Sequence, residues 1–237
     1  MSDADDAAGS GETPETLVWD LPTRLFHWAL VLLLGASWLS ARLGRMEVHH
    51  WSGYAIGTLL LFRLAWGFVG PRHARFGSFL AGPRRVLDYL RDWQAGSPPA
   101  LAGHTPPGGW MIVLMLLLLC AQVATGMMNS HDGLDAGPWY YAASRQWTDF
   151  ANAWHPRFFD ALLVLAVLHI GAVLLYRLWP GVDLIGPMLS GRKRVAAAGI
   201  PGSRPLLAAT LIAAAAAAMW LIVSLAPPPS LADLGIY

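Results

Sequence analysis

Five long apolar runs are separated by polar segments along this chain of 237 residues. They cover residues 23–41, 49–69, 110–127, 155–179 and 205–225. Each run has about the 20 residues that an α-helix needs to cross a hydrocarbon core of about 30 Å. Unbroken apolar runs of this length indicate membrane-spanning helices. We therefore predict an all-α fold, an integral membrane helical bundle with five crossings.

The polar segments carry signals for helix ends and for the membrane surface. Asp20 is a predicted N-cap, with Pro22 in the first turn of the first helix. The stretch PRRVLDYLRDW, which starts at Pro83, predicts a short amphipathic helix lying along the surface. The PPGG at 106–109 is expected to break the chain before the third crossing.

These signals divide the chain into three parts. Residues 1–19 are small and acidic and lack the basic residues of a signal peptide, so they predict a disordered acidic cytoplasmic tail. Residues 20–195 contain the first four crossings, which we expect to form a four-helix core. Residues 196–237 contain a fifth transmembrane helix and a short outer tail.

Charge and composition agree with a membrane protein and limit its chemistry. Only 13% of the residues are charged, against about 25% in soluble proteins, and the net charge of +1 does not indicate a nucleic-acid partner. The one cysteine, Cys120, excludes an intramolecular disulfide, a C-x-x-C-H haem attachment and a Cys-ligated iron–sulfur cluster. Any cofactor must therefore be held by histidine.

Basic residues are distributed unequally between the two sides of the predicted bundle. Eleven Lys and Arg flank the crossings on the side of the N-terminus, and four flank them on the other side. By the positive-inside rule, this predicts a cytoplasmic N-terminus and a periplasmic C-terminus.

Histidines in or beside the crossings fall at two depths. His155 and His169 are 14 residues apart on one predicted helix, so their rings leave nearly the same face, about 21 Å apart along the axis. One metal ion cannot bridge that distance. With alternating helix directions, His27 has the depth of His169, and either His49 or His50 has the depth of His155.

A pair of histidines from facing helices at each depth is what two bis-His haems need. The alternative for any one of them is a packing histidine, although ionisable residues inside membrane helices are rare. Gly53 and Gly57 follow His49 on its helix face and leave clearance for a macrocycle, which favours His49 over His50. Close helix packing is the alternative explanation for these glycines.

Other candidates follow from position. Arg63 lies 14 residues after His49, at the inner depth, where it could pair with a haem propionate or extend toward the cytoplasm. Because Pro156 disfavours the α conformation before it, we expect His155 to be an N-cap with Pro156 at N1. Three histidines of the polar connections are expected to be solvated: His73, His104 and His131. His131, in the outer connection, could touch a partner.

The chain resembles the bacterial cytochrome b561 family in five features. They are VWDLPTRLFHW at 18–28, H-x-x-x-G-Y at 49–54, LLFRLAWGFVGPRHARF at 60–76, GHTPPGGW at 103–110, and the His155/His169 pair. The similarity covers roughly residues 17–195 and is greatest to the b-type cytochrome subunits of nickel–iron hydrogenases. It implies a four-helix core in which two b-type haems are ligated by His27, His49, His155 and His169. Pro156 departs from the family, which commonly has Glu there.

The resemblance implies transmembrane electron transfer in the bacterial cytoplasmic (inner) membrane. The expected partners are the lipid bilayer, a quinone or quinol, and a redox protein, either a hydrogenase-like subunit or a cytochrome c. The chain would then be an electron-transfer subunit rather than a self-contained catalyst. A stand-alone quinone oxidoreductase acting on superoxide or a ferric substrate is the alternative. A haem-free transporter is less consistent, because no carboxylate lies deep in a predicted helix.

Overall fold

The computed structural model describes residues 14–96, 101–130, 135–178, 183–195 and 198–230. Five long helices make up most of this part of the chain. Their bounds are Leu21–Arg42 (α1), Met46–Val69 (α2), Pro106–Met127 (α5), Arg145–Arg177 (α6) and Pro205–Ser224 (α8). All five are long and apolar enough to span a membrane. The prediction of an all-α bundle with five crossings is confirmed.

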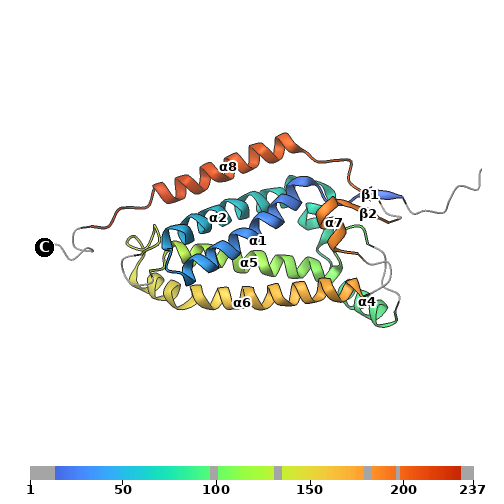
Figure 1. Cartoon of the computed structure of the whole chain (residues 1–237), viewed down its shortest axis with the longest axis horizontal. Coiled ribbons are helices and arrows are strands. Elements are labelled where there is room, and N and C mark those ends of the chain that lie inside the picture. The colour runs from blue at the N-terminus through green and yellow to red at the C-terminus, as the bar shows by residue number, and fades with distance from the viewer. Residues whose placement is uncertain (1–13, 97–100, 131–134, 179–182, 196–197, 231–237) are drawn as a thin grey trace, which may run out of the picture.

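The first four of these helices lie roughly parallel, with α6 along one side of the bundle and α8 along the other (Figure 1). The α1 helix packs against α2, and α5 packs against α6, while α2 also contacts α5 and α8. Buried Phe26, Leu60, Trp66, Leu119 and Leu162 belong to one apolar core between them. Most large apolar side chains of α6 and α8 are instead exposed, as expected of lipid-facing surfaces.

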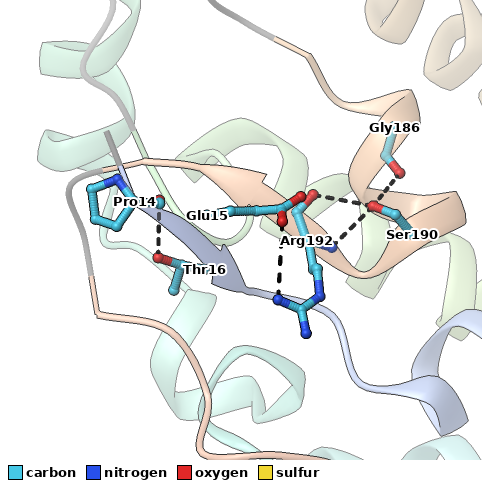
Figure 2. A network of polar contacts seen from close by, with 6 residues as sticks. All are labelled: Pro14, Glu15, Thr16, Gly186, Ser190 and Arg192. Carbon is cyan, nitrogen blue, oxygen red and sulfur yellow. Dashed lines mark hydrogen bonds and ion pairs between the residues drawn. The ribbon is translucent and has the colours of Figure 1, made fainter. Parts of the chain in front are cut away.

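Regular structure begins closer to the N-terminus than predicted, at Glu15. Glu15–Leu17 (β1) pairs antiparallel with Arg192–Arg194 (β2), and Val18 and Trp19 behind it are buried. Figure 2 shows the side chains of Glu15 and Arg192 reaching toward each other from the two strands. Oε2 of Glu15 lies 4.0 Å from Nη1 of Arg192. Disorder is thus the wrong prediction for residues 15–19, because they gain a strand partner from a segment remote in sequence. Residues 1–13 lie outside the described residues.

The start of α1 is fixed to the end of α2 by a buried carboxylate. Asp20 is the N-cap residue of α1 and Pro22 lies in the first turn, as predicted. However, the Asp20 side chain does not cap a backbone N–H. It accepts hydrogen bonds from Trp66 Nε1 at 3.1 Å and from the Thr23 hydroxyl at 2.5 Å. This arrangement orients the two helix ends relative to each other.

Among the described residues, four short helices lie at the end of the bundle near the β1–β2 ribbon (Figure 1). They are Arg72–Ala74 (η1), Phe76–Phe79 (α3), Pro83–Gln94 (α4) and Ile185–Ser190 (α7). The α4 helix begins at Pro83, as predicted. The hydroxyl groups of Tyr89 in α4 and Tyr176 in α6 lie 3.0 Å apart and hydrogen-bond, which connects α4 to the last turns of α6.

The PPGG segment begins a helix rather than breaking the chain before one. Thr105 is the N-cap of α5, and its hydroxyl accepts a hydrogen bond from the Gly108 N–H at 3.2 Å. The two prolines occupy the first turn, where their missing N–H groups would have no helical partner anyway. Gly109 then packs directly against the backbone of Phe79, where a Cβ would come within 2.7 Å of the carbonyl oxygen.

The α6 helix begins ten residues before the predicted N-cap, so that part of the prediction is wrong. Its N-cap is Ser144, and Pro156 lies inside the helix. The preference against α conformation before proline is overcome by the helical turns already formed upstream. Near the proline, the guanidinium of Arg157 donates a 2.6 Å hydrogen bond to the Ala153 carbonyl. His155 is therefore carried by a continuous helix.

Candidate functional site

Two groups of histidines lie at opposite ends of the bundle formed by α1, α2, α5 and α6. We call them the loop end, at the α1–α2 turn and the α5–α6 connection, and the ribbon end, near β1 and β2. His155 and His169 of α6 belong to the loop end and the ribbon end, respectively. Their 14-residue separation corresponds to about 21 Å along the helix.

At the loop end, His49 of α2 and His155 of α6 face each other. Their ring centroids are 6.2 Å apart and their planes are nearly perpendicular, at 84°. Both line a cavity of about 540 Å³ whose walls come from all four helices and include Leu34, Leu119 and Phe159. Its size and mainly apolar lining are those of a site for a small molecule or cofactor.

Backbone carbonyl groups orient both rings. Nδ1 of His49 lies 2.9 Å from the carbonyl oxygen of Ser37 in α1, and Nδ1 of His155 lies 3.1 Å from that of Gln122 in α5. Since a carbonyl oxygen can only accept, each Nδ1 carries the proton and donates. Each Nε2 therefore keeps its lone pair, and the Nε2 of His155 accepts a 3.1 Å hydrogen bond from the Gln122 amide.

His50 also lines the cavity but is oriented differently. Its ring stacks on that of Tyr54, with centroids 6.4 Å apart and planes inclined by 29°. It is the ring of His49 that meets His155.

The two glycines on the face of His49 have different surroundings. Gly53 lines the cavity, and a Cβ added there would meet nothing within 4 Å. At Gly57, a Cβ would lie 2.9 Å from the Met219 sulfur of α8 and 3.3 Å from Val123 of α5. Gly53 thus leaves open space beside the histidines, whereas Gly57 serves close helix packing.

At the ribbon end, His27 of α1 and His169 of α6 are both half-buried and close enough to interact electrostatically. Nδ1 of His27 is buried and has no hydrogen-bond partner among the described residues. The second predicted pair is thus brought to one end of the bundle.

Arg63 of α2 is buried at the same end, with only 3% of its surface exposed. Its guanidinium lies over the ring of Phe76, 5.1 Å from the centroid. Phe76 can approach α2 because it packs on Gly67, where any Cβ would overlap the ring. One guanidinium nitrogen, Nη1, is buried without a hydrogen-bond partner in the described part of the chain. The alternative in which Arg63 extends toward solvent is wrong.

Comparison with known proteins identifies the family. The family described as prokaryotic cytochrome b561 matches residues 18–191, more than half of the chain. The chain belongs to the prokaryotic cytochrome b561 family. It is also similar to two proteins named probable Ni/Fe-hydrogenase B-type cytochrome subunit. The protein from Bradyrhizobium diazoefficiens is 24% identical, and the match covers 81% of this chain and 92% of the relative. The protein from Rhizobium leguminosarum bv. viciae is also 24% identical, and the match covers 77% of this chain and 90% of the relative. No solved structure gives a significant match.

Membership of this cytochrome family makes the chain a membrane protein that binds b-type haem and transfers electrons across the membrane. The loop-end residues fit such a group. An imidazole nitrogen binds a metal at about 2 Å and lies about 1 Å from its ring centroid, so two imidazoles on one ion have centroids at most about 6 Å apart. The observed separation of His49 and His155 is 6.2 Å, and the adjoining cavity has open space at Gly53.

The expectation that the connecting histidines are solvated is wrong for His104. Its ring contacts those of Trp19 and Phe79, at centroid distances of 4.5 and 4.7 Å, and its Nδ1 is buried without a partner among the described residues. Burial, followed by the positive charge of Arg63, lowers the pKa of His104 to about 3.

His73 is also half-buried in this cytochrome rather than solvated. Its Nε2 lies 3.3 Å from the Ala198 carbonyl oxygen and donates to it, while burial lowers the pKa of the ring. The third of these histidines, His131, lies outside the described residues.

Sequence reasoning missed the residues that orient the cytochrome's histidines. Ser37 and Gln122 contact the rings through their backbone carbonyls and also through their side chains, at Nδ1 of His49 and Nε2 of His155. Gly126 of α5 lies against His155, where a Cβ would come within 3.0 Å of Cε1. A glycine within an apolar run was the available signal, but its partner could be found only from the structure.

Proposed function

We propose that this chain is a dihaem cytochrome b that carries electrons across the bacterial inner membrane. One b-type haem would be held between His49 and His155 at the loop end, and the second between His27 and His169 at the ribbon end. The observation that carries the proposal is the loop-end cavity, beside which two imidazoles face each other at a ligand-like distance with their Nε2 lone pairs retained. Each pair has one member on α6, and these two histidines are about 21 Å apart along the helix, so one centre would lie near each membrane surface.

The protein residues would act by positioning and by excluding water. When bound, each haem would supply a reversible one-electron carrier. The carbonyls of Ser37 and Gln122 hold the tautomers that present Nε2 of His49 and His155. Apolar side chains such as Leu34, Leu119 and Phe159 line the cavity. Two histidines would hold each haem, which favours electron transfer over substrate chemistry at the metal.

Arg63 supports the ribbon-end site. A buried charge is stable only when it is paired, and Arg63 forms no ion pair within 4 Å among the described residues. The negative charge of Asp20 acts on Arg63, but Asp20 already accepts two hydrogen bonds from other residues. A carboxylate from outside the chain would complete the site, and a haem propionate supplies one. We therefore assign Arg63 as a propionate partner of the ribbon-end haem.

The membrane orientation and the partners follow from charge and similarity. The excess of Lys and Arg on the N-terminal side supports a cytoplasmic ribbon end and a periplasmic loop end. The relatives named as hydrogenase cytochrome subunits support a hydrogenase-like partner, with a cytochrome c as the alternative. The quinone pool of the membrane would be the other redox partner, with quinone or quinol as the small-molecule reactant.

The first experiment is a reduced-minus-oxidised optical spectrum of the detergent-purified chain, with haem quantified per protein. Two low-spin b haems are expected in the wild type and one in each of the variants His49→Ala, His155→Ala and His27→Ala. His50→Ala, which alters a cavity histidine without removing a proposed ligand, should retain two. Absence of haem, or loss of a haem in His50→Ala but not in His49→Ala, would overturn the proposed ligands.

Arg63→Leu tests the propionate assignment separately. Loss of the cation should lower the midpoint potential of the ribbon-end haem and leave that of the loop-end haem unchanged, because a positive charge stabilises the reduced metal. Arg204→Leu, which removes an exposed arginine bonded to the Val69 carbonyl, is the control. If the midpoint potential of the ribbon-end haem is the same in wild type and Arg63→Leu, the assignment of Arg63 as a propionate partner is wrong.

A further inference from the structure

We propose that α5, which contributes no histidine, positions His155 and lowers the midpoint potential of the loop-end haem through Gln122, Thr125 and Gly126. This inference rests on the proposed haem between His49 and His155. It assigns a role in the electron-transfer reaction to a helix whose sequence contains no proposed metal ligand.

The first contact is a shared proton. Nδ1 of His155 lies 3.1 Å from the carbonyl oxygen of Gln122 and 3.2 Å from the hydroxyl oxygen of Thr125. The hydroxyl donates its own proton within α5, to the carbonyls of Ala121 at 2.7 Å and Gln122 at 3.1 Å. Its lone pairs are therefore available to accept from His155, and the imidazole N–H is divided between two acceptors of α5.

The second contact is the close approach of the His155 ring to Gly126, which has no side chain. A Cβ built there would lie 3.0 Å from Cε1 and 3.5 Å from Nδ1 of His155. The contact to Cε1 is tighter than side chains normally make, so alanine would force the ring to move by a few tenths of an ångström. Gly126 thus lets the ring approach α5 closely enough to reach both acceptors.

The third contact occupies the other nitrogen of the ring. The Gln122 side-chain amide donates to Nε2 at 3.1 Å, while its Oε1 is buried with no hydrogen-bond partner among the described residues. Gln122 therefore contacts both ring nitrogens of His155, with its backbone carbonyl at Nδ1 and its side-chain amide at Nε2. The amide donor satisfies the lone pair that a metal would take, so the amide would have to move aside for His155 to hold a metal.

The consequence for the haem follows from ligand basicity. An imidazole that donates its second N–H to an acceptor becomes a more basic ligand, and a more basic ligand favours the oxidised metal. His49 and His155 both have such acceptors. Nδ1 of His27 has no partner among the described residues. The hydrogen bonds from α1 and α5 should therefore lower the loop-end potential specifically.

The test is a redox titration of the detergent-purified holoprotein, followed by optical and electron paramagnetic resonance spectra. The variants are Thr125→Val, Thr125→Ser and Gly126→Ala. The loop-end haem is identified as the one that disappears in His155→Ala. Thr210→Val is the matched control for the loss of a hydroxyl, because Thr210 of α8 is exposed and bonds only to the Leu206 carbonyl in the described structure. Gly35→Ala, at an exposed helical glycine with nothing within 4 Å, is the control for the added methyl.

In Thr125→Val, the loop-end potential should rise, with two haems per chain and an unchanged ribbon-end potential. Thr125→Ser, which keeps the hydroxyl, should restore the wild-type value. Gly126→Ala should alter the low-spin resonance signal of the loop-end haem or reduce its occupancy, and neither control should do so. If the wild type holds two haems and both Thr125→Val and Gly126→Ala leave the loop-end potential and signal unchanged, this inference fails while the proposed function stands. If His155→Ala removes no haem, both fail.

Discussion

Acidification from pH 7 to pH 5 should destabilise the ribbon end of this cytochrome through His104. The ring of His104 is enclosed by Trp19 and Phe79, and burial, followed by the charge of Arg63, lowers its pKa to about 3. In the unfolded chain, a histidine has a pKa of about 6.5. Between these values the unfolded chain binds a proton that the folded chain does not, so the free energy of unfolding decreases as the pH falls below about 6.5.

The size of the effect at pH 5 depends little on the folded pKa, provided that this pKa lies well below 5. Each pH unit below the unfolded pKa costs about 1.4 kcal/mol, so about 1.5 units cost roughly 2 kcal/mol. For a chain of this size, 1 kcal/mol corresponds to about 2–4 °C in Tm. His104 should therefore account for a decrease of about 4–8 °C between pH 7 and pH 5.

The assay is thermal unfolding of the purified chain in detergent at both pH values, followed by circular dichroism. His104→Gln removes the titration, so its Tm should decrease by about 4–8 °C less than that of the wild type. His73→Gln is the comparison variant. Burial lowers the pKa of His73, but its hydrogen bond to the Ala198 carbonyl raises it again, so the reduction in pH sensitivity should be smaller. Equal decreases in wild type and His104→Gln would refute the reasoning.

Two further substitutions test how the helix ends are held. Asp20→Ala should destabilise the chain by about 1–3 kcal/mol, because it leaves buried Trp66 Nε1 without its acceptor. Thermal unfolding measures this loss, and Asp149→Ala, at an exposed residue, should have little effect. Equal losses of stability in the two variants would contradict the prediction. Gly57→Leu should cost about 1–3 kcal/mol by overpacking against Met219. Adding Met219→Ala should recover part of that loss, whereas exposed Gly35→Leu should cost little, and no recovery would argue against the contact.

The crossings could be predicted from the sequence because a bilayer sets their length and polarity. All five apolar runs are helices, and the fifth, 205–225, agrees with Pro205–Ser224 within a residue. Prediction failed where a helix continues into a polar segment. The first ten residues of α6 include Arg145 and Asp149, so hydropathy placed the helix start at the apolar run, and the local rule for Pro156 supported the same wrong boundary.

The histidine positions could be paired by depth, since a helix converts sequence spacing directly into distance. The structure brings His49 to His155, and it brings His27 and His169 to one end of the bundle. The environment of His104 could not be predicted in this way. Its burial depends on Trp19, which is held by backbone contacts with Gly191, and no local pattern relates three segments so distant in the sequence.

The difference between the two histidine pairs depends on helix geometry that residue types alone do not show. The acceptors for His49 and His155 include the main-chain carbonyls of Ser37 and Gln122, and every residue in an apolar helix has such a group. A free acceptor direction and a close approach are both needed, and at His155 the approach depends on Gly126. With the haems proposed above, a helix without a single proposed ligand would control one metal centre and leave the other, about 21 Å along α6, untouched.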